Sequence, residues 1–382
     1  MVDVIEGYRS GNTGFNQNQR VVEMKDTIYE LNPSMTPLTV LIGKLRKTET
    51  TQAKYEWMED EKMPNWDAVN YGGGYSAVAT DIVVDNVEFF EAGQTITFPR
   101  TGEVARIASR TVASDLIIIV RGAGAAILND NEVIMIIADG NEEGATSKDA
   151  KQTVLTNLYN YTQIFRTPVA ITRTEKVSKL IGGNELDRQR NKRAQEHQEK
   201  IERAFWWGKR AIVTGGTHPL RYTGGVFEFV TTNVTDFGGM MTEYDFEKYL
   251  ETASYYGTDN KVTFMAARPI SVVNGFAKDK LYVVDQAKKE FGLDIVKYIS
   301  PHGSINMTKH PMFEGNVFGY YMVTLDISDD CIEYRYLTDS DTQLHQNIQA
   351  NDLDGQKDEY LTECGLMIAN EKRHAIGTDI KS

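Results

Sequence analysis

The sequence predicts an α+β fold, and three observations support that prediction. Short strand-like runs separated by glycine and turn residues fill much of the first half of the chain. Long helical patterns start at Glu185 and at Thr242. In the last third, strands and helices mix without the regular repeat of a doubly wound parallel sheet.

Composition is typical of a folded globular protein. The chain has 382 residues, of which 41% are hydrophobic and 25% charged, enough for one large core or two to three domains. Its most apolar runs, Leu116–Val120 and Val133–Ile137, are far shorter than the roughly 20 residues of a membrane helix. The N-terminus lacks the basic start and apolar block of a secretory signal. We therefore expect neither a membrane span nor export.

The charge and the cysteine content argue against nucleic-acid binding, a disulfide framework, and zinc or redox sites. The formal net charge of −13 repels phosphate, which disfavours sequence-independent binding of nucleic acid. The two cysteines, Cys331 and Cys364, are too few for a disulfide framework and lack the CxxC spacing of zinc and redox sites. We expect both to be reduced residues of the core or of a strand.

The N-terminal part, up to about residue 48, is predicted to be an extended arm. It is rich in glycine, asparagine and glutamine, and Pro33 and Pro37 stand beside a short apolar group, so it cannot bury a core alone. Leu38, Leu41 and Ile42 belong to this group, and their apolar side chains need to be buried against another surface. The sequence therefore predicts that the arm lies against a neighbouring surface, such as another subunit.

Two strand-like runs follow, Lys54–Glu61 and Ile82–Phe90, and together they predict a long two-stranded excursion. Several short strands with glycine turns then predict a compact all-β insertion between residues 92 and 143. Those strands are Thr95–Phe98, Val104–Ala108, Leu116–Val120 and Val133–Ile137.

Helical character is expected after Pro168 and is clearest in the block Glu185–Arg210. Its apolar residues recur at helical spacing, whereas Asp187–Arg193 contains none. The helix is therefore predicted to lie across a surface, with much of its circumference in solvent or beside charged neighbours. Trp206-Trp207 is expected to anchor its end. The apolar stripe is Ala194, His197, Ile201, Ala204 and Phe205, and the expected i,i+4 ion pairs are Glu196 with Lys200 and Glu199 with Arg203.

A second amphipathic helix is predicted from Thr242, because Asp245 three residues later completes a capping box. Its buried face would carry Phe246, Tyr249, Leu250 and Ala253. A short helix is expected after Pro269. The remaining predicted strands are Lys261–Ala266, Val317–Ile327, Ile332–Leu337 and Tyr360–Ala369.

Signals for catalysis are weak. The stretch Gly122–Ile127 has two of the three glycines of a dinucleotide loop and is better explained as a barrel-rim turn. Phosphate-loop, GxSxG and HExxH motifs are absent from the sequence. The six histidines are dispersed, and Asp352-Leu353-Asp354-Gly355 lacks the flanking carboxylates of a calcium loop. No catalytic, metal-binding or cofactor-binding residue and no cofactor is predicted, and we expect that the chain is not an enzyme.

Four stretches stand in an order that resembles the major capsid proteins of tailed bacteriophages. They are NPSMTPLTVLIGKL at Asn32–Leu45, YNYTQIFRTPV at Tyr159–Val169, the helical block Glu185–Arg210 and the closing Asp358–Ile380. The resemblance is to the Hong Kong 97-like fold, and within it to the SU10-type major capsid family. It covers most of the chain and concerns packing rather than chemistry.

The resemblance implies a division into parts. These are an N-terminal arm (1–48), an extended loop (49–91 and 144–168) that lies on the adjacent subunit, the all-β insertion (92–143), a peripheral domain with a long spine helix (169–224 and 331–382) and an axial domain (225–330). Relatives that weld subunits use a lysine and an asparagine; Lys54 or Lys62 and Asn370 lack a diagnostic motif, so no cross-link is expected.

The resemblance also implies a function. The chain would be a major capsid protein that self-assembles into pentamers and hexamers of an icosahedral head shell enclosing double-stranded DNA, without binding that DNA specifically. Assembly would take place in the host cytoplasm, and the protein would end in the virion. Expected partners are further copies, a separate scaffolding protein and a portal protein; a decoration protein is another candidate.

Seven residues are predicted as inter-subunit contacts: Leu38, Leu41, Ile42, Trp57, Trp66 (which follows Asn65), Arg188 and Arg193. Two alternatives stay open. One is another phage structural protein of the tail or decoration type, which the all-β insertion fits but the long helix does not. The other is a cytoplasmic hydrolase with an unrecognised carboxylate site, which would form a small oligomer rather than particles.

Overall fold

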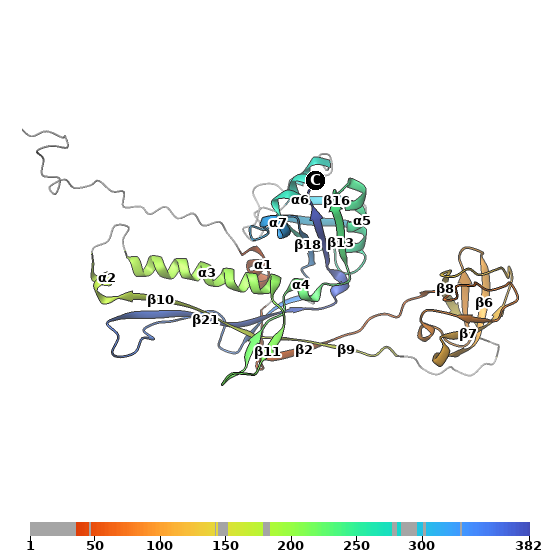
Figure 1. The fold of residues 1–382 in the computed structure, drawn as a ribbon, viewed down its shortest axis with the longest axis horizontal. Helices are drawn as coiled ribbons and strands as arrows, with labels where there is room; N and C mark the ends of the chain where they lie inside the picture. The colour runs from red at the N-terminus through yellow and green to blue at the C-terminus, as the bar shows by residue number, and fades with distance from the viewer. Residues whose placement is uncertain are drawn as a thin grey trace, which may run out of the picture. The chain divides into compact units, whose positions relative to one another are not determined.

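The computed structural model describes residues 36–45, 47–141, 143, 152–178, 184–276, 281–283, 296–300, 303–328 and 331–382 (Figure 1). The chain divides into two compact units. We call Met58–Asn157 the barrel unit, and Met1–Trp57 with Leu158–Ser382 the frame unit. Residues 1–35 of the predicted arm lie outside the described residues.

One sheet of the frame unit is built around a long strand, β21 (Gly355–Ile368). Strand β10 (Gln163–Thr172) pairs with it antiparallel along its whole length. On the other side of β21 lie β19 (Ile332–Leu337) and β20 (Gln343–His345), both antiparallel to it. Strand β1 (Lys47–Thr50) adds to β19 in parallel. The sheet thus joins the start, the middle and the end of the chain.

Helix α3 (Glu185–Trp207) runs along β10 and β21 (Figure 1). It begins after Asn184, whose side chain accepts a hydrogen bond from the Leu186 amide at 3.1 Å and so satisfies one free donor of the helix start. It ends at Gly208, where an added Cβ would lie 2.4 Å from the Ala204 carbonyl oxygen. The predicted long helix is confirmed, with an earlier end.

The second sheet of the frame unit has seven strands in the order β13-β22-β18-β14-β17-β16-β15. Its central strand β14 is fully buried, parallel to β17 and antiparallel to β18. The strands are β13 (Val234–Gly239), β14 (Lys261–Met265), β15 (Leu281–Val283), β16 (Val296–Ser300), β17 (Gly303–Lys309), β18 (Met322–Asp326) and β22 (Ala375–Ile380).

Helix α5 (Glu243–Ser254) packs against β22, and its capping box between Thr242 and Asp245 is present as predicted. All four residues of its predicted apolar face are buried. Helix α6 (Ala267–Phe276) packs against β14. The other helices are α1 (Pro37–Leu45), α2 (Arg173–Val177), α4 (Val226–Phe229) and α7 (Gly315–Phe318).

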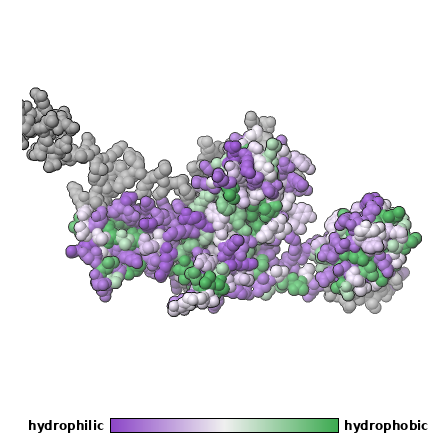
Figure 2. Space-filling model, in the orientation of Figure 1, coloured by the Kyte–Doolittle hydropathy of each residue, from purple (hydrophilic) through white to green (hydrophobic). Residues whose placement is uncertain are grey.

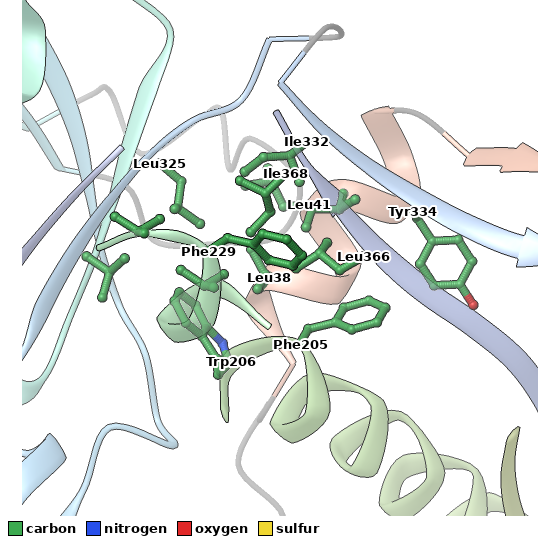
Figure 3. Close-up of a cluster of buried hydrophobic side chains, with 14 of the residues drawn as sticks. Leu38, Leu41, Phe205, Trp206, Phe229, Leu325, Ile332, Tyr334, Leu366 and Ile368 are labelled. Carbon is green, nitrogen blue, oxygen red and sulfur yellow. The ribbon is translucent and has the colours of Figure 1, made fainter. Parts of the chain in front are cut away.

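The largest hydrophobic cluster of the frame unit lies where α1, α3, α4 and both sheets meet. Leu38 and Leu41 from α1 point toward Phe205 and Trp206 of α3 and toward Leu366 of β21 (Figure 3). A smaller cluster fills the space between the second sheet and helices α5 and α6. Trp206 is fully buried, so the predicted anchoring by the tryptophan pair is confirmed for this residue.

The barrel unit is a six-stranded sheet in the order β3-β8-β5-β6-β7-β4. An antiparallel bridge between Val69 and Val84 closes it, and closure removes exposed sheet edges. Its interior is apolar. The strands are β3 (Trp66–Ala68), β4 (Asp81–Val83), β5 (Gln94–Phe98), β6 (Glu103–Thr111), β7 (Leu116–Arg121) and β8 (Val133–Asp139), and short 3-10 helices cover Val87–Phe89 and Val112–Ser114.

Two further ribbons lie outside these sheets. Strands β2 (Lys54–Glu59) and β9 (Thr156–Tyr161) pair with each other. Strands β11 (Ala211–Val213) and β12 (Leu220–Tyr222) form an antiparallel hairpin directly after α3. A short 3-10 helix, Glu371–Arg373, precedes β22.

Several predicted elements differ from the structure. The apolar end of the arm is a helix, α1, rather than extended chain. Residues Ile82–Phe90 form β4 and a 3-10 helix, and β4 pairs with β7, so the two-stranded excursion is made by β2 and β9 instead. The insertion also includes β3 and β4, which lie before the expected boundary at residue 92.

Long-range pairing explains the remaining differences. Helical character was expected after Pro168, but β10 continues through this residue opposite Glu359, because proline is tolerated on an edge strand. Within the predicted strand Val317–Ile327, the first part is the helix α7. Strand β22 was not predicted; it pairs with β13 and β18, which lie far away in sequence.

Both cysteines are free and buried, as predicted. Burial raises the pKa of the Cys364 thiol to about 12. The Cys331 sulfur accepts a hydrogen bond from Arg373 at 2.7 Å.

Candidate assembly surfaces

Helix α3 is held on its sheet by a mixed apolar and polar face. His197 is fully buried in this face, and its ring nitrogens lie 3.0 Å from the Thr167 hydroxyl of β10 and 2.8 Å from the Thr362 hydroxyl of β21. Burial lowers the pKa of His197 to about 4. A neutral imidazole therefore joins the helix to two strands.

The polar first half of α3 is fixed by a buried ion pair. The Arg190 guanidinium donates to the Asp358 carboxylate of β21 at 2.6 and 2.9 Å, and the Asn347 amide donates to the same group at 2.9 Å. Burial alone would raise the pKa of Asp358, but these donors outweigh it and hold the pKa below its usual range. The predicted charged neighbour of this half-helix is thus a strand carboxylate.

The start of α1 is attached to α3 by one buried carboxylate. Glu202 accepts hydrogen bonds from the Leu38 and Thr39 amides at 2.9 and 2.7 Å. His310 Nε2 lies 2.8 Å from the same carboxylate, and the Trp206 indole donates to it at 3.3 Å. Because a helix N-terminus has unpaired donors and a positive dipole end, a carboxylate there is stabilising. We call this group the Glu202 latch.

A groove of about 410 Å³ lies at the end of α3. Its walls combine the apolar side chains of Trp207, Met312 and Phe318 with the Glu199–Arg203 pair, whose charged atoms are 3.9 Å apart. This pair confirms one of the two i,i+4 contacts predicted for the helix. Lys200 instead donates to the Thr167 hydroxyl at 2.9 Å.

The β11–β12 hairpin exposes an unusual amount of apolar surface. Ile212, Val213 and Leu220 are 45%, 49% and 53% exposed, and Tyr222 is also exposed. From Arg203 to Phe227 the sequence contains no Asp or Glu and four Lys and Arg. A two-stranded hairpin in water is marginally stable by itself, so this segment is a candidate contact surface.

The outside of the barrel unit is a second candidate. Trp66 lies opposite Met135, Met135 opposite Thr97, and Thr97 opposite Val104, which forms one row across four strands. A neighbouring row runs through Ala138, Thr95, Arg106 and Val120. These residues alternate with the buried interior, so they point outward. We call the two rows, with Val133 and Ile137, the outer face.

The outer face is apolar for a surface. Trp66, Val120 and Ile137 are each more than half exposed, and Arg106 is the single charged residue in the two rows. Figure 2 shows hydrophobic residues gathered on the visible side of the barrel unit. Contiguous apolar patches on soluble proteins commonly mark interaction sites.

The structure places the three arm residues in the subunit's own core. Leu38, Leu41 and Ile42 are 0%, 2% and 1% exposed. This corrects the premise on which they were predicted as inter-subunit contacts, namely that the arm cannot cover them within one chain. Side chains of α3 and β21 bury these three residues, and the Glu202 latch holds the start of α1 against α3.

The other four predicted contacts are scattered. Trp57 is buried and stacks with Tyr55, whereas Trp66 is exposed on the outer face. Arg188 donates to Glu185 at 2.6 Å, and Arg193 pairs with Glu196, both within α3. Their role between subunits stays a prediction. The hairpin and the Glu202 latch were missed; the acid-free stretch Arg203–Phe227 was a signal for the hairpin.

Within the described ranges, no group of three or more His, Cys, Asp or Glu residues is arranged to hold a metal ion. The loop after β7 turns at Gly124, with φ +88°, and continues without a helix, as expected for a barrel-rim turn. No helix in the described part of the chain has both the length and the apolar character to cross a bilayer.

The family model for the SU10 major capsid protein matches residues 8–381. The chain belongs to this family. It is therefore a major capsid protein, a component of the phage head shell and of the virion, and the predicted resemblance is confirmed. The capsid protein has no match among curated protein sequences.

Solved structures agree on the fold of the capsid protein. The capsid of a native GTA particle matches with a TM-score of 0.51 at 9% identity, covering 95% of this chain and 96% of the other. The capsids of Myoviridae phage XM1 (TM-score 0.47, 9% identity, 97% and 100% covered) and Microbacterium phage Oxtober96 (0.45, 9%, 95% and 96%) are also similar. The predicted Hong Kong 97-like α+β fold is confirmed.

Proposed function

We propose that copies of this capsid protein assemble into pentamers and hexamers, which close an icosahedral head shell around double-stranded DNA. The observation that carries the proposal is the exposed apolar surface of the β11–β12 hairpin, on a chain of a capsid family. A hairpin that leaves Ile212, Val213 and Leu220 in water gains stability when another copy covers it. Weak contacts of this kind add up when each is repeated around a closed shell.

The proposed role is structural rather than catalytic. The buried titratable groups of the frame unit serve internal contacts: His197 joins α3 to two strands, and Glu202 fixes α1. The Lys261 ammonium donates to the Tyr256 and Arg373 carbonyls at 2.6 and 3.1 Å. These groups hold elements together and leave little for acid or base chemistry.

The proposed partners follow from the same role. The net charge of −13 suits a container whose wall does not grip DNA. We expect a separate scaffolding protein to guide assembly in the host cytoplasm and a portal protein to occupy one vertex. The outer face of the barrel unit is a candidate site for a decoration protein or for another copy.

The first test is assembly itself. The full chain is expressed alone and together with any scaffolding candidate encoded beside it, and the products are examined by sedimentation and negative-stain electron microscopy. Rings, tubes or closed shells are expected. A small, dispersed species under every condition would overturn the proposal and favour the hydrolase alternative, for which the groove beside Glu199 would be the place to look.

A second test separates the hairpin from the rest of the subunit. Ile212→Asp places a charge on the exposed hairpin surface and should abolish particles while the subunit stays folded. Val177→Asp is the matched control, because Val177 is 79% exposed on α2, away from the hairpin. Particles of normal yield from Ile212→Asp would contradict the role given to the hairpin.

A further inference from the structure

The outer face of the barrel unit is nearly free of charge, whereas the unit that carries it is strongly acidic. Residues 58–157 contain 16 Asp and Glu against 7 Lys and Arg, a net charge of −9 out of −13 for the chain. Outward-facing positions of an antiparallel sheet are ordinarily polar. An apolar face kept within such an acidic unit requires an explanation, and contact with a partner supplies one.

The charge of the barrel unit restricts which partner can cover this face. Two barrel units that met face to face would bring a charge of −9 next to another of −9, and such repulsion opposes association. Two acidic residues stand at one end of the face beside Gln94: Asp139 pairs with Gln94 across the strands, and the Glu91 amide donates to the Gln94 side chain. The surface therefore fits a partner that is apolar in the centre and basic at its margin.

The β11–β12 hairpin has this combination. Its exposed apolar side chains lie between Lys209 at the entry to the hairpin and Arg221 within β12, in a stretch that contains no carboxylate. Tyr244 on α5, another exposed apolar residue of the frame unit, has a different setting, because it stands among Glu243, Asp245 and Glu247. Of the surfaces described, the hairpin is the one whose charge complements the barrel unit.

The shapes of the two surfaces also agree. Both are faces of twisted antiparallel strands, and such faces pack on each other at about 10 Å with their side chains interdigitated. Val213 lies opposite Leu220 and Ala211 opposite Tyr222, so these four side chains share one face of the hairpin. That face presents two large apolar pairs to the rows of Trp66 and Val120.

We propose that the β11–β12 hairpin of one copy packs on the outer face of the barrel unit of a second copy. This inference rests on the proposed shell function and names the pair of surfaces that one of its contacts uses. The central contact is apolar, with Leu220 and Val213 against Val133 and Ile137. The margin is electrostatic, because the hairpin stretch carries Lys209 and Arg221 and no carboxylate beside the acidic barrel unit.

Engineered cysteines test this pairing directly, since a disulfide forms only when two Cβ atoms approach within about 3.5 to 4.5 Å. Chains carrying Ile137→Cys and chains carrying Leu220→Cys are mixed, assembled and oxidised, and the particles are run on a non-reducing gel. The native thiols of Cys331 and Cys364 are buried, so they are not expected to form disulfides in this experiment. A second pair, Val133→Cys with Val213→Cys, repeats the test in case one substitution disturbs its own position.

A covalent dimer is expected in the mixed particles, about tenfold above the control pair Ile137→Cys with Val177→Cys, because the contact fixes the sulfur atoms together. No dimer from either pair would overturn the inference, as would a dimer from the Ile137→Cys chains alone, which indicates contact between barrel units. A cross-link within one chain carrying both cysteines, without dimers, also overturns it. Particle formation by the unmodified chain tests the proposed function separately.

Discussion

Helix α1 and the β11–β12 hairpin are both short apolar segments, yet they end in opposite environments. Leu38, Leu41 and Ile42 of α1 are almost fully buried, whereas Ile212 and Leu220 of the hairpin are about half exposed. The two segments differ in the groups of the same chain that bind them. The Glu202 carboxylate on α3 accepts hydrogen bonds from the Leu38 and Thr39 amides of α1, and the apolar side of α1 packs in the core. The apolar side chains of the hairpin keep about half of their surface in solvent, which fits the proposed contact with another copy.

The largest effect is expected from a charge placed under α1. Leu41→Asp would bury an unpaired carboxylate and should lower the stability of the docked helix by more than about 4 kcal/mol. Chemical unfolding of the subunit, with hydrogen exchange at α1, measures the loss. A stable variant that only fails to assemble would restore the view that this residue contacts a neighbouring subunit.

A smaller loss is expected from weakening the Glu202 latch. Glu202→Gln keeps the shape of the side chain but removes the charge that accepts from the α1 amides, a change worth about 2 kcal/mol. Protease accessibility of the segment around Leu38 should rise accordingly. Glu199→Gln, on the same helix in a partly exposed pair with Arg203 whose charged atoms are 3.9 Å apart, is the control and should change stability by under about 0.5 kcal/mol. Equal effects from the two variants would refute the latch.

The buried histidines make the stability of the frame unit depend on pH. The pKa of His197 falls from 6.5 to about 4 on folding, so between these values the unfolded chain binds a proton that the folded chain does not. Stability is therefore complete above pH 6.5 and declines as the pH falls toward 4, at about 1.4 kcal/mol per pH unit for one histidine. His197→Gln should flatten the measured slope by about this amount. The pKa of His374 is also lowered to about 4, so this residue accounts for the dependence of stability on pH that remains in His197→Gln.

The smallest effect on stability is expected at the hairpin. Ile212→Asp changes an exposed position, so the free energy of unfolding of the isolated subunit should stay within about 0.5 kcal/mol of the original. The same variant should abolish assembly, as proposed above. Calorimetry of the unassembled subunit checks the first part, and a loss of several kcal/mol there would show that the hairpin belongs to the subunit's core.

Local signals were sufficient for some elements of the fold. The capping box of α5 lies within four residues of sequence, and its prediction was confirmed together with the buried face of the helix. The interior strands of the barrel unit were also predicted, since alternation and turn residues are local. The family resemblance supplied the assignment to a capsid fold, which no single motif could have given.

Other elements depend on partners that are distant in sequence. Pro168 argues locally against a strand, but β10 forms a continuous ladder with β21, and this long-range pairing makes the segment a strand. The amide of Leu38 meets Glu202 across 164 positions, so the sequence could show that α1 needs cover but not that the same chain provides it. The candidate surfaces were missed for the same reason: exposure is a property of the folded chain.

The burial of Cys364 has a consequence for the particle's chemical durability. A thiol reacts with oxidants chiefly as the thiolate, and a pKa of about 12 with no exposed surface leaves almost none at neutral pH. In the proposed head shell, this residue would therefore form no stray disulfides when the particle moves from reducing to oxidising surroundings.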